Sequence, residues 1–62
     1  MAISKVTAGK LAAQADREWQ RKLDALGLKR WSPEAKGAPG TVLRNLYEAK
    51  IFADEMQHEA NT

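Results

Sequence analysis

Apolar residues recur at steps of three and four along two stretches of this chain, the spacing that gathers side chains on one side of an α-helix. In the first stretch these positions are Ala8, Leu11, Ala12, Ala15, Trp19, Leu23 and Leu26. In the second they are Val42, Leu46, Ala49, Ala53, Met56 and Ala60, an apolar seam of the kind that packs against another helix. The pattern predicts an all-α fold with two long helices, over residues 8–26 and 41–60.

The start of the first helix carries a capping signal. Thr7 precedes the first apolar position and can accept a hydrogen bond from the first turn, while Val6 can close on Leu11 as a hydrophobic staple. Residues 1–6 show little periodicity, and residues 61–62 follow a polar helix end. We therefore expect both ends of the chain to fray.

The end of the first helix is marked by Gly27, which directly follows the last apolar position. Helices commonly stop at a residue in the left-handed conformation, which glycine adopts without the steric penalty of a Cβ atom. In a Schellman ending, the residue after the glycine folds back on the helix, and Leu28 and Leu23 supply the apolar pair that this motif favours. The sequence therefore predicts a sharp stop at Gly27.

A second set of turn signals follows in the connection. Ser32 can cap a short helix, Pro33 suits its first position, and Gly37 can end it. These signals predict a single helical turn over residues 33–36.

The second long helix can be capped by Thr41 or opened by Pro39, and a short connection makes the two helices antiparallel neighbours. We therefore expect an αα-hairpin that forms a single domain over residues 1–62. Domains this small usually need disulfides, a metal or a partner chain. With no cysteine and one histidine, the hairpin is expected to be completed by oligomerisation or by a partner.

The second helix carries more apolar residues than one neighbouring helix can cover. Ile51 and Phe52 are adjacent in sequence and point to different sides of the helix, and both lie off the apolar seam. Contiguous apolar surface on a small protein commonly marks an interaction site. The predicted site for a protein partner or a second copy consists of Trp31, Leu43, Tyr47, Ile51 and Phe52.

The two tryptophans have different expected roles. Trp19 lies on the apolar stripe of the first helix, so we expect it in the core. Trp31 lies in the connection, where it either covers the hairpin or is presented to a partner.

Sites for metals, cofactors and substrates are not expected. His58 has Asp54 and Glu55 nearby on the same helix, but these ligands are too few for a structural zinc site. No phosphate-binding glycine loop is present, and a hairpin of this size has little room for a water-excluding cleft. We expect no enzymatic activity, no cofactor and no small-molecule substrate.

The cellular location is expected to be the cytoplasm. No apolar run approaches the roughly 20 residues of a membrane span, and the first residues do not form a secretory signal. The absence of cysteine fits a reducing compartment.

Charge is distributed unevenly along the chain, with a net charge of +4 on residues 1–36 and −2 on residues 37–62. This asymmetry can steer the basic half towards phosphates or pair two copies, basic half to acidic half. Four polar positions at helical spacing form what we call the basic ridge of the first helix. They are Lys10, Gln14, Arg17 and Arg21.

An alternative function, binding to nucleic acid, uses this ridge and the connection beyond it. Its predicted contacts are Lys10, Arg17, Arg21, Lys29 and Arg30. A helix-turn-helix arrangement is not expected, because the short helix over residues 33–36 has only one turn. Interaction with a protein is the leading hypothesis.

Overall fold

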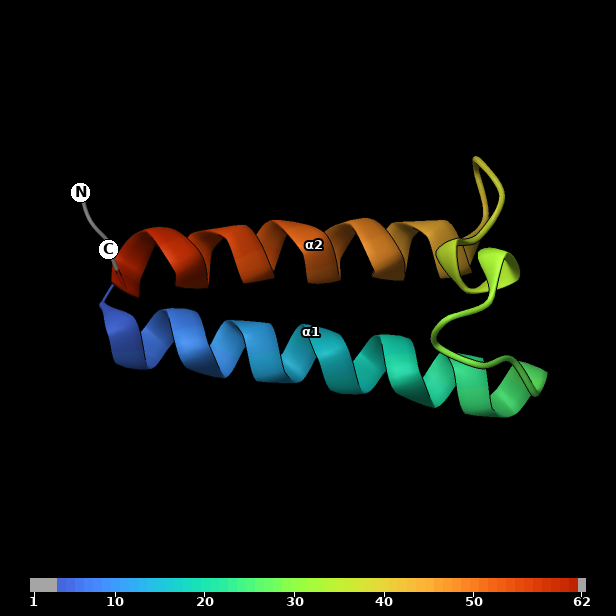
Figure 1. Ribbon diagram of the computed structural model, residues 1–62, viewed down its shortest axis with the longest axis horizontal. Coiled ribbons are helices and arrows are strands. Elements are labelled where there is room, and N and C mark those ends of the chain that lie inside the picture. The colour runs from blue at the N-terminus through green and yellow to red at the C-terminus, as the bar shows by residue number, and fades with distance from the viewer. Residues whose placement is uncertain (1–3, 62) are drawn as a thin grey trace.

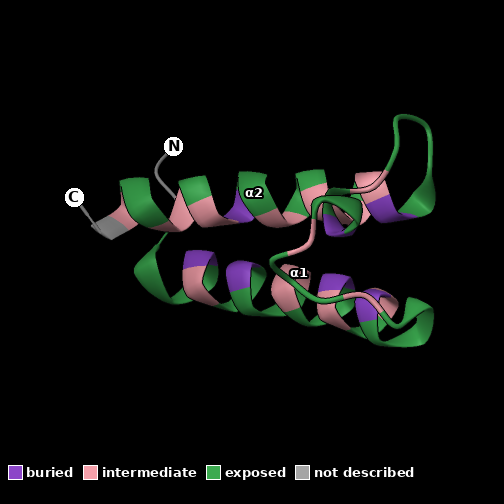
Figure 2. Ribbon diagram, turned by 45° about the vertical axis from the view of Figure 1, so that its right-hand side comes forward, coloured by how far each residue is buried: buried purple, intermediate pink, exposed green. Residues whose placement is uncertain are grey.

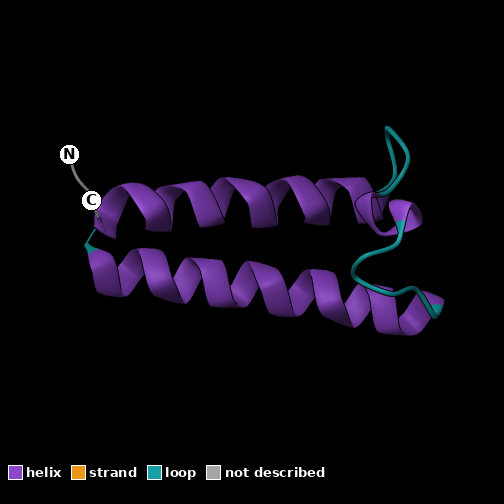
Figure 3. Cartoon of the chain, viewed as in Figure 1, coloured by secondary structure: helices purple, strands orange, loops and turns teal. Residues whose placement is uncertain are grey.

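Two long antiparallel helices and a connection with one short helical turn make up the computed structural model, which describes residues 4–61. Helix α1 spans Lys5–Leu26, the 3₁₀ helix η1 spans Pro33–Lys36, and helix α2 spans Val42–Asn61. Figures 1 and 3 show α1 and α2 side by side, with the start of α1 and the end of α2 at the same end of the molecule. The predicted all-α hairpin is confirmed.

The start of α1 differs from the prediction. The cap is Ser4 instead of Thr7: the Ser4 hydroxyl oxygen accepts a hydrogen bond from the Thr7 backbone N–H at 3.1 Å. The helix therefore begins at Lys5, and Thr7 lies inside its first turns. Val6 is 68% exposed, so it does not close on the helix as a staple.

The expected fraying of the chain ends stays a prediction. Residues 4–6 cap or belong to α1, and Asn61 is the last residue of α2. Residues 1–3 and Thr62 lie outside the described part of the chain.

The end of α1 has the predicted Schellman geometry. Gly27 is in the left-handed conformation, with φ 71° and ψ 25°. Its N–H donates to the Asp24 carbonyl at 3.2 Å, and the Leu28 N–H donates to the Leu23 carbonyl at 2.9 Å. Leu28 is thereby folded back to pack on the core.

The connection confirms one predicted cap and corrects another. The Thr41 hydroxyl accepts a hydrogen bond from the Arg44 backbone N–H at 3.1 Å and so caps α2. The Ser32 hydroxyl does not cap η1; it donates instead to the Lys29 carbonyl at 2.8 Å. That carbonyl lies in the turn after α1, so the serine closes this turn, while Pro33 opens η1 as predicted.

The bulky part of the core lies at the end of the hairpin that carries the connection. It is formed by Trp19 and Leu23 of α1, Ala35 of η1 and Leu43 of α2. Trp19, expected in the core, is 4% exposed, and its indole N–H donates to the Ala35 carbonyl at 2.9 Å. The rings of Trp19 and Tyr47 lie 5.5 Å apart between centroids. One indole therefore ties all three helical elements together.

The other half of the hairpin is closed by small side chains. Its buried residues are Ala8 and Ala12 of α1 and Ala53 of α2. Figure 2 shows the buried positions of α1 along the side that faces α2. Buried residues therefore occur along the whole hairpin, but the buried side chains in this half are much smaller.

The rotation of α2 about its axis differs from the prediction. Within the predicted seam, Ala53 is buried, but Ala49 is exposed and Val42 is 63% exposed. Leu46 of the seam packs against the core together with Leu43 and Tyr47, which lie outside the seam. The physical reason is volume, because the Trp19 ring requires large apolar neighbours and three of the six seam residues are alanine. Part of the seam, including Ala49 and Met56, is thus turned towards one side of the hairpin.

Candidate functional site

An apolar groove runs between α1 and α2 on the side of the hairpin towards which the seam is turned. Phe52, at its margin, is 63% exposed, and Leu11 is 38% exposed. The groove is lined by Leu11, Gln14, Ala15 and Glu18 from α1 and by Ala49, Phe52, Ala53 and Met56 from α2. Its lining combines three alanines with the larger apolar side chains of Leu11, Phe52 and Met56.

The α1 wall of this groove carries one charged residue, Glu18, and the basic ridge lies just outside the wall. Gln14 lines the groove and also belongs to the basic ridge, so the ridge borders the groove. Lys10, Arg17 and Arg21 are exposed. They take part in none of the ion pairs found among residues 4–61.

The α2 edge of the groove is acidic. Phe52 also lines a neighbouring hollow on the outside of α2, together with Glu48 and Glu55. Glu48 accepts a hydrogen bond from Arg44 at 2.9 Å, and its side chain remains 61% exposed. We call Glu48 and Glu55 the acidic edge. The basic ridge therefore flanks the groove beyond its α1 wall and the acidic edge flanks it beyond its α2 wall, while Glu18 places one acid on the α1 wall itself.

The opposite side of the hairpin is closed by a polar clasp centred on Arg30. Its guanidinium donates to both Asp16 carboxylate oxygens, at 2.6 and 3.2 Å, and to the Gln20 side chain at 2.9 Å. Its central carbon lies 4.8 Å from the Trp19 ring centroid. Lys50 lies near the same ring, at 5.5 Å, and donates to Asp54 at 2.6 Å.

The clasp also changes the acidity of its carboxylate. Hydrogen bonding from Arg30 lowers the pKa of Asp16 below its ordinary value, and attraction to Arg30 and Lys50 acts in the same direction, while burial opposes the shift. The same pair raises the pKa of Arg30. Asp16 is therefore ionised and paired at neutral pH, and this side offers a closed polar surface.

The predicted interaction residues are placed in different surroundings. Leu43 is 7% exposed and belongs to the core, and Tyr47 packs partly buried against it. Ile51 is 37% exposed, and it lines the same hollow on α2 as Tyr47 and Phe52. Trp31 is 84% exposed, so it does not cover the hairpin. Of the five, Phe52 alone lines the groove.

The residues that complete the groove were not predicted as site residues. Leu11, Ala15, Ala49 and Met56 were interpreted as contacts within the hairpin. The sequence signal for the groove is the surplus of apolar positions on α2. Because one neighbouring helix cannot cover them all, one stripe has to remain exposed. Which stripe stays open depends on how α2 is rotated.

The predicted nucleic-acid contacts also divide into two groups. Lys10, Arg17, Arg21 and Lys29 are exposed. Arg30 is held in the clasp by Asp16, on the other side of α1 from the groove. The ridge and Arg30 are therefore not brought onto one surface.

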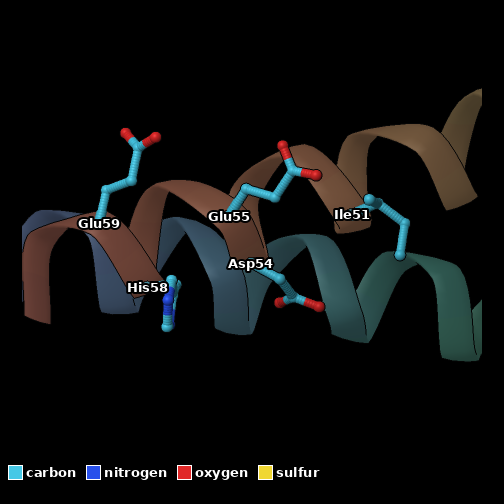
Figure 4. A pocket seen from close by; sticks show the side chains of 5 residues that line it. All are labelled: Ile51, Asp54, Glu55, His58 and Glu59. Atoms are coloured by element: carbon cyan, nitrogen blue, oxygen red, sulfur yellow. The ribbon is translucent and has the colours of Figure 1, made fainter. Parts of the chain in front are cut away.

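The titratable side chains near the end of α2 point in different directions. Figure 4 shows Glu55 and Glu59 pointing away from Asp54 and His58. Among residues 4–61, no cluster of three or more potential His, Cys, Asp or Glu ligands is present. No helix in this part of the chain is both long and apolar enough to span a bilayer.

No protein-family model matches this chain, and comparisons with curated proteins and with solved structures find no match either. The function must therefore be inferred from the chain's own surface.

Proposed function

We propose that this chain is a non-enzymatic helical interaction protein, a small regulator, inhibitor or assembly factor that docks an apolar face on a protein surface. The observation that carries the proposal is the groove beside Phe52, whose aromatic side chain is 63% exposed. Leaving such a ring in water forgoes roughly 25 cal/mol for every Å² of apolar surface that a partner would cover. The cytoplasm is the proposed location.

The groove has the features of a helix-binding site. Ala15 and Ala49 are small, so an incoming helix can approach its base closely, while Leu11, Phe52 and Met56 provide apolar contacts. Aromatic residues next to such contacts frequently dominate binding energy. We assign binding to the groove and give Phe52 the largest share.

The test compares two variants that add the same charge. Phe52→Glu places a carboxylate at the groove, and Ala13→Glu places one at an exposed α1 position that does not line the groove. Circular dichroism checks that both keep the helix content of the wild type. We expect Phe52→Glu to lose both self-association and capture of proteins from an extract, and Ala13→Glu to retain them. Unchanged behaviour of a folded Phe52→Glu variant in both assays would refute the proposal.

A second candidate function, nucleic-acid binding, is favoured by the exposure of the cations on the basic ridge. Arg17, Arg21 and Lys10 are outside all ion pairs found among the described residues, so they are available to phosphates. Binding to a mixed duplex and to single strands should fall steeply with salt and weaken in Arg17→Ala/Arg21→Ala. Absence of binding at low salt would remove this candidate.

A further inference from the structure

The basic ridge flanks the apolar groove on its α1 side and the acidic edge flanks it on its α2 side, and this arrangement points to an occupant. Resting on the proposed function, we propose that a second copy of the chain occupies the groove, related by a twofold axis that runs parallel to the helices. The product is an antiparallel four-helix bundle in which α1 of each copy lies on α2 of the other. Four-helix bundles are a common way for helical hairpins to complete a core.

Charge complementarity selects this arrangement. A twofold axis along the helices places the basic ridge of one copy, with Lys10 and Arg17, over the acidic edge of the other, with Glu48 and Glu55. By symmetry the same contact forms twice. The rival arrangement, with the axis across the helices, lays α1 on α1 and sets ridge against ridge. Like charges disfavour that alternative.

The apolar residues also come into register under this symmetry. Rotation about an axis parallel to the helices does not shift any residue along that axis. Residues that face each other across the groove within one copy therefore also face each other across the interface between the two copies. Leu11 and Met56 line the same groove, as do Gln14 and Phe52. Phe52 of one copy is therefore covered by α1 of the second copy, beside Gln14. The part of the apolar seam that lines the groove thereby packs on a helix of the second copy.

The exposed surface is large enough for such an interface. A compact monomer of 6.9 kDa exposes about 4,000 Å², whereas this hairpin exposes 4630 Å². The excess, about 600 Å² for each copy, is comparable to the share of each partner in the smallest stable interfaces, which bury about 1,200 Å² in total.

Sedimentation equilibrium of the full chain, from micromolar to millimolar concentration, tests the proposal. We expect a monomer–dimer equilibrium that Phe52→Glu weakens at least about tenfold, with Ala13→Glu as the control that retains wild-type association. Added salt should weaken the wild-type dimer, because it screens ridge-to-edge attraction. A dimer that strengthens with salt would overturn the proposed arrangement.

A crosslinking experiment tests the orientation independently. The natural chain has no cysteine, so Glu18→Cys and Ala49→Cys each introduce a single thiol on the groove lining. We expect a short bismaleimide to link an equimolar mixture of the two variants more efficiently than either variant alone. Preferential linking of each variant to itself would overturn the arrangement of α1 on α2.

The outcomes separate this inference from the proposed function. A wild-type chain that stays monomeric throughout overturns the inference. If capture of a separate protein still depends on Phe52 in that case, the interaction function stands with a different occupant. If no capture depends on Phe52, both fall.

Discussion

The two halves of the hairpin are closed in different ways. At the end with the connection, Trp19, Leu23 and Leu43 form a bulky core, and the Arg30 clasp covers the indole from one side. In the other half the helices meet through alanines such as Ala12, and the apolar groove beside them is open. The first half is complete within one chain, whereas the second leaves apolar surface exposed.

This difference teaches where stability and function are located. A domain below about 70–80 residues rarely gains more than 3–5 kcal/mol from a single core, and here the large side chains of that core are gathered around Trp19. The alanine half adds little volume and leaves the groove open, where we propose that a partner binds. Changes in the first half should unfold the chain, whereas changes along the groove should alter association.

The largest expected effect on stability comes from replacing Trp19, and the same change at Trp31 is the comparison. Trp19→Ala removes the buried ring and leaves the Ala35 carbonyl without its donor, a loss of about 3–5 kcal/mol that would unfold most of the chain. Trp31→Ala, at a position that is 84% exposed, should change stability by less than about 0.5 kcal/mol. Urea unfolding followed by circular dichroism measures both. Equal effects would refute the assignment of the core to Trp19.

Two glycines in the connection provide an intermediate effect. Gly37 has φ 79°, and a Cβ atom there would lie 2.5 Å from the Arg44 backbone nitrogen. Gly40 has φ 82°, but its Cβ atom would meet nothing within 4 Å. We expect Gly37→Ala to cost more than about 2 kcal/mol and Gly40→Ala about 1–2 kcal/mol. Thermal unfolding checks the order, and the reverse order would contradict the close packing of the connection on α2.

The smallest effect concerns the clasp and depends on pH. The pKa of Asp16 is lowered by Arg30, so the pair stabilises the fold above the unfolded-state pKa, and this contribution is lost as pH falls through the folded-state pKa. Asp16→Asn should cost less than about 1 kcal/mol at neutral pH, because the pair is partly exposed. As the pH is lowered, the free energy of unfolding of Asp16→Asn should decrease less than that of the wild type.

Arg30→Gln serves as the companion variant in this titration. It removes the cause of the shift, so its acid unfolding profile should also be shallower than that of the wild type. A profile identical to that of the wild type for both variants would mean that the clasp does not contribute to stability.

Local rules predicted most of the fold. The steps of three and four identified both helices, and the Gly27 ending, the Thr41 cap and the burial of Trp19 followed from near neighbours in the sequence. The start of α1 was missed because Ser4 and Thr7 are both competent caps. The choice of Ser4 adds one more turn to the helix.

The parts that could not be predicted depend on contacts between distant residues. Helix α2 has two apolar stripes, one through Leu43 and Tyr47 and one through Ala49 and Met56, and the volume of Trp19 on α1 selects the first. Arg30 pairs with Asp16, 14 residues away, across the turn after α1. Neither contact follows from the spacing of residues along the sequence, so the groove and the clasp could be found only in the structure.

Amide hydrogen exchange measured at several protein concentrations tests the central claim most directly. The core around Trp19 should be protected at every concentration, because one chain completes it. Amides along the groove, at Leu11–Ala15 and Ala49–Met56, should gain protection as concentration rises and the second copy covers them. Protection along the groove that stays constant with concentration, while the core remains folded, would contradict the account.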